Sequence, residues 1–180
     1  LDKENKCQFI AKEKLKHFVS KDAFNIEGLG KKVIDQLWDL SLIKEPSNIF
    51  NLNYEKIETL EGWGKLSVSN LKSAIDKSSQ VLLDKFIYSL GIRHIGQENA
   101  KLLGNFFKNI TKLIELFNTS KQENLLKSIG ELDGIGLAQL KSLKEFFSNK
   151  KNEKVVSSLT KHLKIENSKT NNKDGKLSGK

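Results

Sequence analysis

One five-residue pattern occurs four times in the chain, as IEGLG at 26–30, LEGWG at 60–64, IRHIG at 92–96 and LDGIG at 132–136. Each copy reads apolar, any residue, Gly (His in the third copy), apolar, Gly. After the last Gly, the fourth residue is always apolar and the seventh is always Leu. Offsets of four and seven lie on one face of a helix. The sequence therefore predicts a tight glycine turn leading into an amphipathic helix, four times over.

The turns have a chemical meaning as well as a structural one. Glycine is needed where φ is positive or where another molecule approaches the backbone closely. A turn that feeds a helix N-terminus presents unpaired N–H groups and the positive end of the helix dipole, which suits a phosphate. The pattern resembles that of the helix–hairpin–helix, and this resemblance implies binding of the DNA backbone without reading sequence. A Gly-x-Gly between helices can also be a cap followed by a turn, but four copies with matching offsets favour binding.

Helical spacing of apolar residues dominates the chain up to residue 163 and predicts an all-α fold. The copies start 34, 32 and 40 residues apart, which argues against a strict repeat array and favours two paired units, 12–80 and 81–163. Residues 164–180 are rich in Lys, Asn, Ser and Gly, which predicts a disordered, flexible linker. Helices are expected at 12–18, 30–40, 46–52, 54–60, 65–76, 82–90, 97–107, 110–117, 124–129, 137–148 and 153–163.

The composition favours a polyanionic partner. The 180 residues carry a net charge of +9, and Arg93 is the only Arg. Lys is a mobile point charge that suits phosphates better than base edges. The single Cys7 excludes an internal disulfide and suits a reducing compartment. No apolar run reaches the ~18 residues of a membrane span. Because the sequence contains no Met, we expect it to be a piece of a longer protein.

Three longer strings carry a resemblance to a known family: LKHFVSKDAFNIEGLGKKVIDQL at 15–37, LEGWGKLSVSNL at 60–71 and SLGIRHIGQENAKLL at 89–103. Over residues 7 to about 163 the chain resembles the helix–hairpin–helix domain of bacterial NAD-dependent DNA ligases. The resemblance implies that Cys7 is the last ligand of a four-Cys zinc finger, of which residues 1–11 are the remnant. It also implies that DGKLSGK at 174–180 leads toward a BRCT domain.

The resemblance implies the DNA-clamping part of a ligase that seals nicks in DNA replication and repair through an adenylated intermediate. NAD, magnesium and zinc would serve the whole protein, and this segment would bind no cofactor. The expected partner is nicked double-stranded DNA, held by its backbone without sequence preference. The protein is expected to be a monomer in the cytoplasm, with the chromosome and away from membranes.

The candidate DNA-binding residues are those of the turns and the polar residues beside them: Gly28, Leu29, Gly30, Lys31, Lys32, Gly62, Trp63, Gly64, Lys65, Arg93, His94, Ile95, Gly96, Gln97, Gly134, Ile135 and Gly136. The third copy has His94 in place of Gly, which suggests that this position does not need positive φ or tolerates it poorly. The fourth copy is followed by the neutral Leu137 and Ala138, so its electrostatic share should be smaller.

Two alternatives remain open. One is a helix–hairpin–helix module of another DNA repair or recombination protein. The other is a non-enzymatic helical module for protein–protein interaction, which the apolar Leu29, Trp63 and Ile135 at the turns would suit. A catalytic site is not expected, because the three His are scattered and Cys7 has no Cys companions for a complete zinc site. Gly28-Leu29-Gly30 also lacks the third Gly of a dinucleotide fingerprint.

Overall fold

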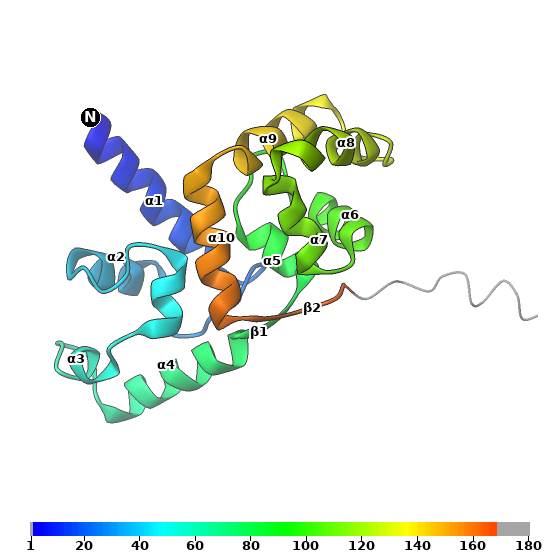
Figure 1. The fold of residues 1–180 in the computed structure, drawn as a ribbon. Coiled ribbons are helices and arrows are strands. Elements are labelled where there is room, and N and C mark those ends of the chain that lie inside the picture. The colour runs from blue at the N-terminus through cyan, green and yellow to red at the C-terminus, as the bar shows by residue number, and fades with distance from the viewer. Residues whose placement is uncertain (1, 169–180) are drawn as a thin grey trace, which may run out of the picture.

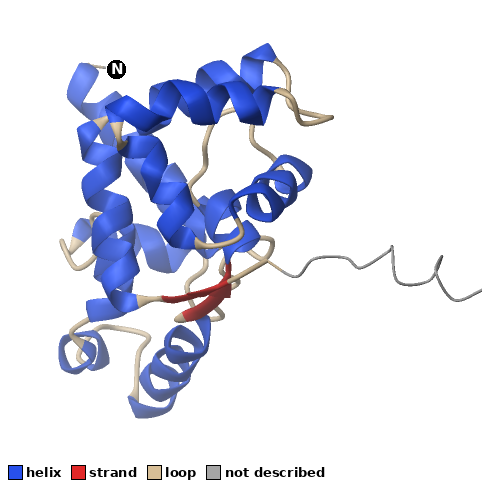
Figure 2. Ribbon diagram, turned by 45° about the vertical axis from the view of Figure 1, so that its right-hand side comes forward, coloured by secondary structure: helices blue, strands red, loops and turns tan. Residues whose placement is uncertain are grey.

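The computed structural model describes residues 2–168, most of which are helical (Figures 1 and 2). The elements in chain order are α1 (Lys3–Val19), α2 (Lys31–Asp39), the 3-10 helix η1 (Pro46–Asn51), α3 (Tyr54–Glu58), α4 (Lys65–Ser78), β1 (Gln80–Leu82), α5 (Leu83–Ser89), α6 (Gln97–Phe107), α7 (Ile110–Ile114), the 3-10 helix η2 (Glu115–Phe117), α8 (Thr119–Gly130), α9 (Leu137–Phe147), α10 (Lys150–His162) and β2 (Lys164–Glu166). The predicted all-α class is confirmed, and β1 and β2 form the only sheet within the described residues. No helix in this part of the chain is long and apolar enough to cross a membrane. The predicted linker beyond residue 168 lies outside the described residues.

A helix begins directly after each glycine turn, as predicted: α2, α4, α6 and α9. The leucines seven residues after the last Gly are all buried: Leu37, Leu71, Leu103 and Leu143. The residues at offset four are buried or half-buried: Ile34, Val68, Ala100 and Leu140. The repeated offsets therefore mark the faces by which these four helices pack into the core.

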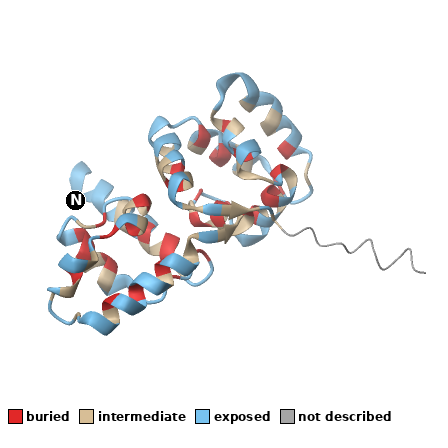
Figure 3. Cartoon of the chain, turned by 60° about the horizontal axis from the view of Figure 1, so that its bottom comes forward, coloured by how far each residue is buried: buried red, intermediate tan, exposed pale blue. Residues whose placement is uncertain are grey.

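The turns pack in pairs against each other's helices. A Cβ on Gly28 would lie 3.5 Å from Leu71 Cδ1 on α4, so the first turn touches the helix that follows the second. Trp63 Nε1 in turn donates a hydrogen bond to Gln36 Oε1 on α2, at 3.1 Å. In the second half, a Cβ on Gly134 would lie 3.1 Å from Leu102 Cδ1 on α6. Two lobes result (Figure 3), each built around two turns.

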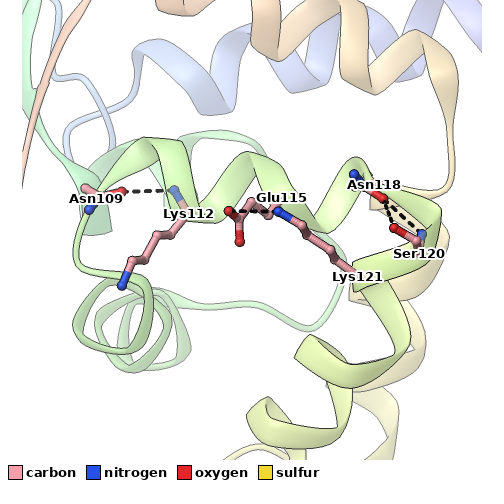
Figure 4. Close-up of polar contacts among 6 residues, drawn as sticks. All are labelled: Asn109, Lys112, Glu115, Asn118, Ser120 and Lys121. Atoms are coloured by element: carbon pink, nitrogen blue, oxygen red, sulfur yellow. Dashed lines mark hydrogen bonds and ion pairs between the residues drawn. The ribbon is translucent and has the colours of Figure 1, made fainter.

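The connection between the third and fourth turns is longer than the others and is held by local caps (Figure 4). Asn109 Oδ1 accepts the Lys112 N–H at 2.9 Å at the start of α7, and Asn118 Oδ1 accepts the Ser120 N–H at 3.0 Å at the start of α8. Lys121 Nζ pairs with Glu115 across the join, at 3.3 Å. These caps satisfy helix ends that would otherwise lack partners. The 40-residue spacing is longer than the 32-residue spacing before it because α7 and η2 lie between the two longer helices α6 and α8.

The two lobes are tied together at the end of the chain. Strand β2 runs parallel to β1, with Gln80 opposite Lys164, and the Lys164 N–H donates to Ser79 O at 2.8 Å. Helix α10 packs against both α9 and η1, so it runs between the lobes (Figure 1). Residues 164–166, placed in the linker by composition, thus form a strand instead. Three residues carry too little pattern to predict one.

Helix α1 begins at Lys3, not at residue 12 as predicted. Asp2 Oδ1 accepts the Asn5 N–H at 2.8 Å and caps it. The early turns contain good helix formers but bury almost nothing, and Phe9 and Ile10 are 60% and 45% exposed. Because no apolar stripe marks this part of α1, periodicity could not locate its start.

The buried end of α1 is anchored to both lobes. Asp35 on α2 accepts ion pairs from Lys16 Nζ at 3.1 Å and Lys12 Nζ at 3.5 Å. The close contact with Lys16 lowers the pKa of the Asp35 carboxyl and raises the pKa of the Lys16 ammonium. His17 Nε2 lies 2.7 Å from Tyr88 O at the end of α5. Helix α1 therefore joins the first turn's helix to the element that leads into the third turn.

Candidate nucleic-acid interface

The four turns, named hairpin 1 (26–30), hairpin 2 (60–64), hairpin 3 (92–96) and hairpin 4 (132–136), share one backbone geometry. In each, the fourth residue's N–H donates to the first residue's carbonyl, at 3.3, 3.1, 3.0 and 3.2 Å respectively. The third residue has positive φ in all four: Gly28 (93°), Gly62 (84°), His94 (65°) and Gly134 (99°). Positive φ at this position is the signature of a type II turn. The first glycine of the pattern is therefore explained by the turn itself.

His94 corrects one expectation. The substitution of His for Gly suggested that hairpin 3 does not need positive φ, but His94 has φ of 65° like its counterparts. A non-glycine residue in this region is strained by roughly 1–3 kcal/mol. The His94 side chain is exposed, and its carbonyl accepts a hydrogen bond from Asn99 Nδ2 at 3.0 Å. Hairpin 3 thus keeps the turn geometry at a cost in stability.

The apolar residue at the fourth position of the pattern faces the core in three hairpins. Leu29, Ile95 and Ile135 are 2%, 6% and 7% exposed, and Trp63 is half-buried on Gln36. The buried side chains of Leu29, Ile95 and Ile135 therefore hold hairpins 1, 3 and 4 to the body of the protein. Leu29 and Ile135 therefore offer little of the apolar surface that would favour a protein–protein module, whereas Trp63 stays partly exposed.

Neither the turn geometry nor packing explains why the last residue of the pattern is glycine. Gly30, Gly64 and Gly96 have φ of −72°, −149° and −86°, which any residue adopts. A Cβ built on any of the three meets nothing within 4 Å among the described residues. At Gly136, with φ of −101°, it meets only Gln139 Oε1, at 3.0 Å. Neither backbone conformation nor packing in the chain requires glycine at Gly30, Gly64 or Gly96.

Each of these glycines is the N-cap of the following helix, where backbone N–H groups lack helical partners. The Gly30 and Gly96 N–H groups have no hydrogen-bond acceptor within residues 2–168. The Gly64 N–H donates to Ser67 Oγ at 2.9 Å, and the Gly136 N–H donates to Gln139 Oε1 at 3.0 Å. Sequence reasoning missed both caps, although a polar residue three positions after a helix N-cap is their signal.

The charges near the hairpins are unevenly distributed. Lys31, Lys32, Lys65 and Arg93 are all exposed, and none forms an ion pair within the described part of the chain. Gln97 is exposed beside them. Hairpin 4 differs, because Asp133 is the only charged residue between 132 and 139. An attraction for phosphates is therefore expected mainly at hairpins 1 to 3.

The hairpins border two hollows. Hairpins 1 and 2 both border an open groove of about 1030 Å³, and Glu27 and Glu61 are among the residues that line it. Hairpin 3 and α1 border a shallower hollow of about 500 Å³, lined in part by Phe9, His17 and His94. Residues of hairpins 1 and 2 thus line one common groove.

A zinc site is not built by the described residues. Cys7 is exposed on α1, and within residues 2–168 no three His, Cys, Asp or Glu side chains gather to hold a metal ion. A structural zinc ion needs four ligands, of which Cys7 could supply one. The chemistry available at the hairpins is thus hydrogen bonding by amides and charge attraction by Lys and Arg.

Comparison with known proteins agrees with this picture. Residues 85–156, which contain hairpins 3 and 4, match a family described as the helix-hairpin-helix motif. The chain is 51% identical to a DNA ligase of Pelagibacter ubique (strain HTCC1062) over 97% of its own length and 25% of that protein's. It is 42% and 41% identical to DNA ligases of Rickettsia bellii (strain RML369-C) and Rickettsia canadensis (strain McKiel), over 93% of its length and 26% of theirs. The resemblance to DNA ligases is confirmed, and the chain spans about a quarter of the length of these relatives.

Proposed function

We propose that this chain is the DNA-binding part of an NAD-dependent DNA ligase and grips nicked double-stranded DNA by its backbone, without sequence preference. The observation that carries the proposal is the open space at Gly30, Gly64 and Gly96. A glycine that the fold does not require is explained by a partner that comes close to the backbone from outside. The similarity to DNA ligases over nearly the whole chain supports DNA as that partner.

The chemistry of the hairpins suits the sugar–phosphate backbone. Free N–H groups at a helix N-terminus, with the dipole behind them, bind anionic oxygens. Exposed Lys31, Lys32 and Lys65 add charge without the bidentate geometry that reads base edges. Contacts of this kind fix position on a duplex and carry no direct sequence information.

The reaction itself belongs to the rest of the proposed protein. We place NAD, the adenylated intermediate, magnesium and zinc in those remaining parts of the protein. Work on replication and repair nicks in the cytoplasm, beside the chromosome, is part of the same proposal. The role of this chain would be to hold the duplex as a monomer while the remaining domains act on the nick.

The test measures binding of the chain to a fluorescein-labelled nicked duplex by fluorescence anisotropy, at a series of salt concentrations. If about five phosphates are neutralised, log K should fall against log salt with a slope of roughly −4 to −5, at about 0.9 per phosphate. A nicked duplex of scrambled sequence is the control and should bind equally well. Salt-independent affinity, or strong preference for one of the two sequences, would contradict the proposal.

A further inference from the structure

The four hairpins fall into two kinds according to their last amide. In hairpins 1 and 3 the N–H of Gly30 and of Gly96 meets no acceptor within the described residues. In hairpins 2 and 4 the same N–H is already bonded, to Ser67 Oγ and to Gln139 Oε1. A bonded amide must exchange one hydrogen bond for another when a phosphate arrives, so it gains less from the contact.

The exposed leucines follow the same division. Leu66 and Leu137 are 76% and 86% exposed, more than any other large apolar side chain in the described part of the chain. Leu66 is the second residue of α4, after hairpin 2, and Leu137 is the first of α9, after hairpin 4. The matching positions after hairpins 1 and 3 hold polar residues: Lys31, Lys32, Gln97 and Glu98.

Both leucines lie in the first turn of a helix, so their side chains point toward the hairpin before it. Side chains of an α-helix lean toward its N-terminus. Leu66 and Leu137 therefore lean toward the helix end at which Gly64 and Gly136 lie. A single exposed leucine on a protein surface needs no explanation, but the two most exposed leucines both lie within two residues of a glycine whose N–H is already bonded.

Charge sets hairpins 1 and 4 apart, whereas hairpins 2 and 3 are each balanced, with Glu98 offsetting Arg93 at hairpin 3. Around hairpin 1, Lys31 and Lys32 outnumber Glu27, whereas around hairpin 4 the lone charge is Asp133. At hairpin 2, Glu61 offsets Lys65. Hairpins 2 and 4 are thus less suited to phosphates by their amides, and hairpin 4 also by its charge, and both are followed by an exposed apolar side chain.

We infer that the hairpins divide the work on DNA: hairpins 1 and 3 hold phosphates by open amides, whereas Leu66 and Leu137 pack against deoxyribose. The inference rests on the proposed function. Along each DNA strand, the sugar carbons form the apolar surface between successive phosphates. A leucine beside a turn that binds the backbone would therefore contact these sugar carbons. Leu66 and Leu137 are positioning residues in this scheme, and sugar contacts keep the binding independent of sequence.

The test compares Leu66→Ser, Leu137→Ser and the double variant with the wild-type chain on the nicked duplex, by anisotropy over a salt series. Each variant should bind about fivefold more weakly, because burying about 40 Å² of apolar surface is worth that factor at about 25 cal/mol per Å². The double variant should lose roughly 25-fold, and the salt slope should stay unchanged because no phosphate contact is removed. Leu40→Ser is the matched control, since Leu40 is exposed at the far end of α2 and should not affect binding.

Helical circular dichroism of each variant confirms that it is folded. A double variant that binds as tightly as the wild type, while Gly30→Val binds weakly, would overturn the inference and leave the proposed function standing. A changed salt slope would also overturn it, because the leucines would then act through charge. A wild-type chain that does not bind the duplex overturns both, and this is seen before any variant is compared.

Discussion

Replacing Gly30 by Val separates the two reasons for which a hairpin uses glycine. Gly30 has φ of −72° and ψ of 175°, and nothing among the described residues lies within 4 Å of an added Cβ. Valine adopts this conformation freely. It is a poorer N-cap residue than glycine, so the free energy of unfolding should fall by at most about 1 kcal/mol. A melt followed by circular dichroism should show a drop in Tm of only a few degrees.

The same change should damage DNA binding far more. The valine side chain fills the space through which a phosphate would reach the Gly30 and Lys31 amides. A hydrogen bond to a charged group is worth about 1.5–3 kcal/mol, which is roughly a 10- to 150-fold change in Kd. Anisotropy with the labelled nicked duplex, at one fixed salt concentration, measures this loss.

Gly28→Val is the matched control, because it lies two residues away and fails for the opposite reason. Gly28 has φ of +93°, and its Cβ would touch Leu71 Cδ1 at 3.5 Å. A β-branched residue there is strained by about 1–3 kcal/mol, so this variant should lose stability first. Wild-type affinity in a folded Gly30→Val protein would refute the reasoning, since the open space would then have no occupant.

Three further outcomes are expected. His94→Gly should raise the free energy of unfolding by ~1 kcal/mol, because the strain of a non-glycine residue at φ of 65° is relieved; an unchanged or lower Tm would contradict this. Asp35→Asn should lower Tm at neutral pH but not at the extremes. The stabilisation by the Asp35 carboxylate is present above its unfolded pKa of 3.8 and is lost as pH falls through the lowered folded pKa. The stabilisation by the Lys16 ammonium is present below its unfolded pKa of 10.5 and is lost as pH rises through the raised folded pKa. A Tm difference that persists in strong acid would therefore be inconsistent with the ion pair. Incubation of the chain with labelled NAD should give no covalent AMP adduct, and a stoichiometric adduct would show that the adenylation chemistry had been assigned to the wrong part of the protein.

The hairpins and the helices behind them could be predicted from the sequence because both are encoded locally. Glycine at positions such as Gly28 marks the turn, and the leucines at offset seven mark the buried face. The start of α6 was predicted at the residue where it occurs, Gln97. Four repetitions of one spacing left little freedom in the assignment.

What could not be predicted depends on contacts or on weak patterns. His94 keeps positive φ because the turn around it is fixed by Ile92 and Ile95, which are buried, and this outweighs the preference of His itself. Whether Ser67 or Gln139 bonds the amide of a glycine depends on side-chain conformation, which spacing alone does not give. The exposure of Leu66 also had to come from the structure, because an apolar residue in a first helical turn is as readily buried.

The pairing of β1 with β2 fixes the spacing between the two pairs of hairpins. Because the chain returns from α10 to the junction of the lobes at Ser79, twisting one pair of hairpins against the other would break the Lys164–Ser79 hydrogen bond and the packing of α10 on η1. The distance from hairpins 1 and 2 to hairpins 3 and 4 is therefore set before a duplex arrives. If the chain binds DNA as proposed, a bent or unwound duplex would have to be straightened, at an elastic cost, to meet hairpins held at this fixed spacing.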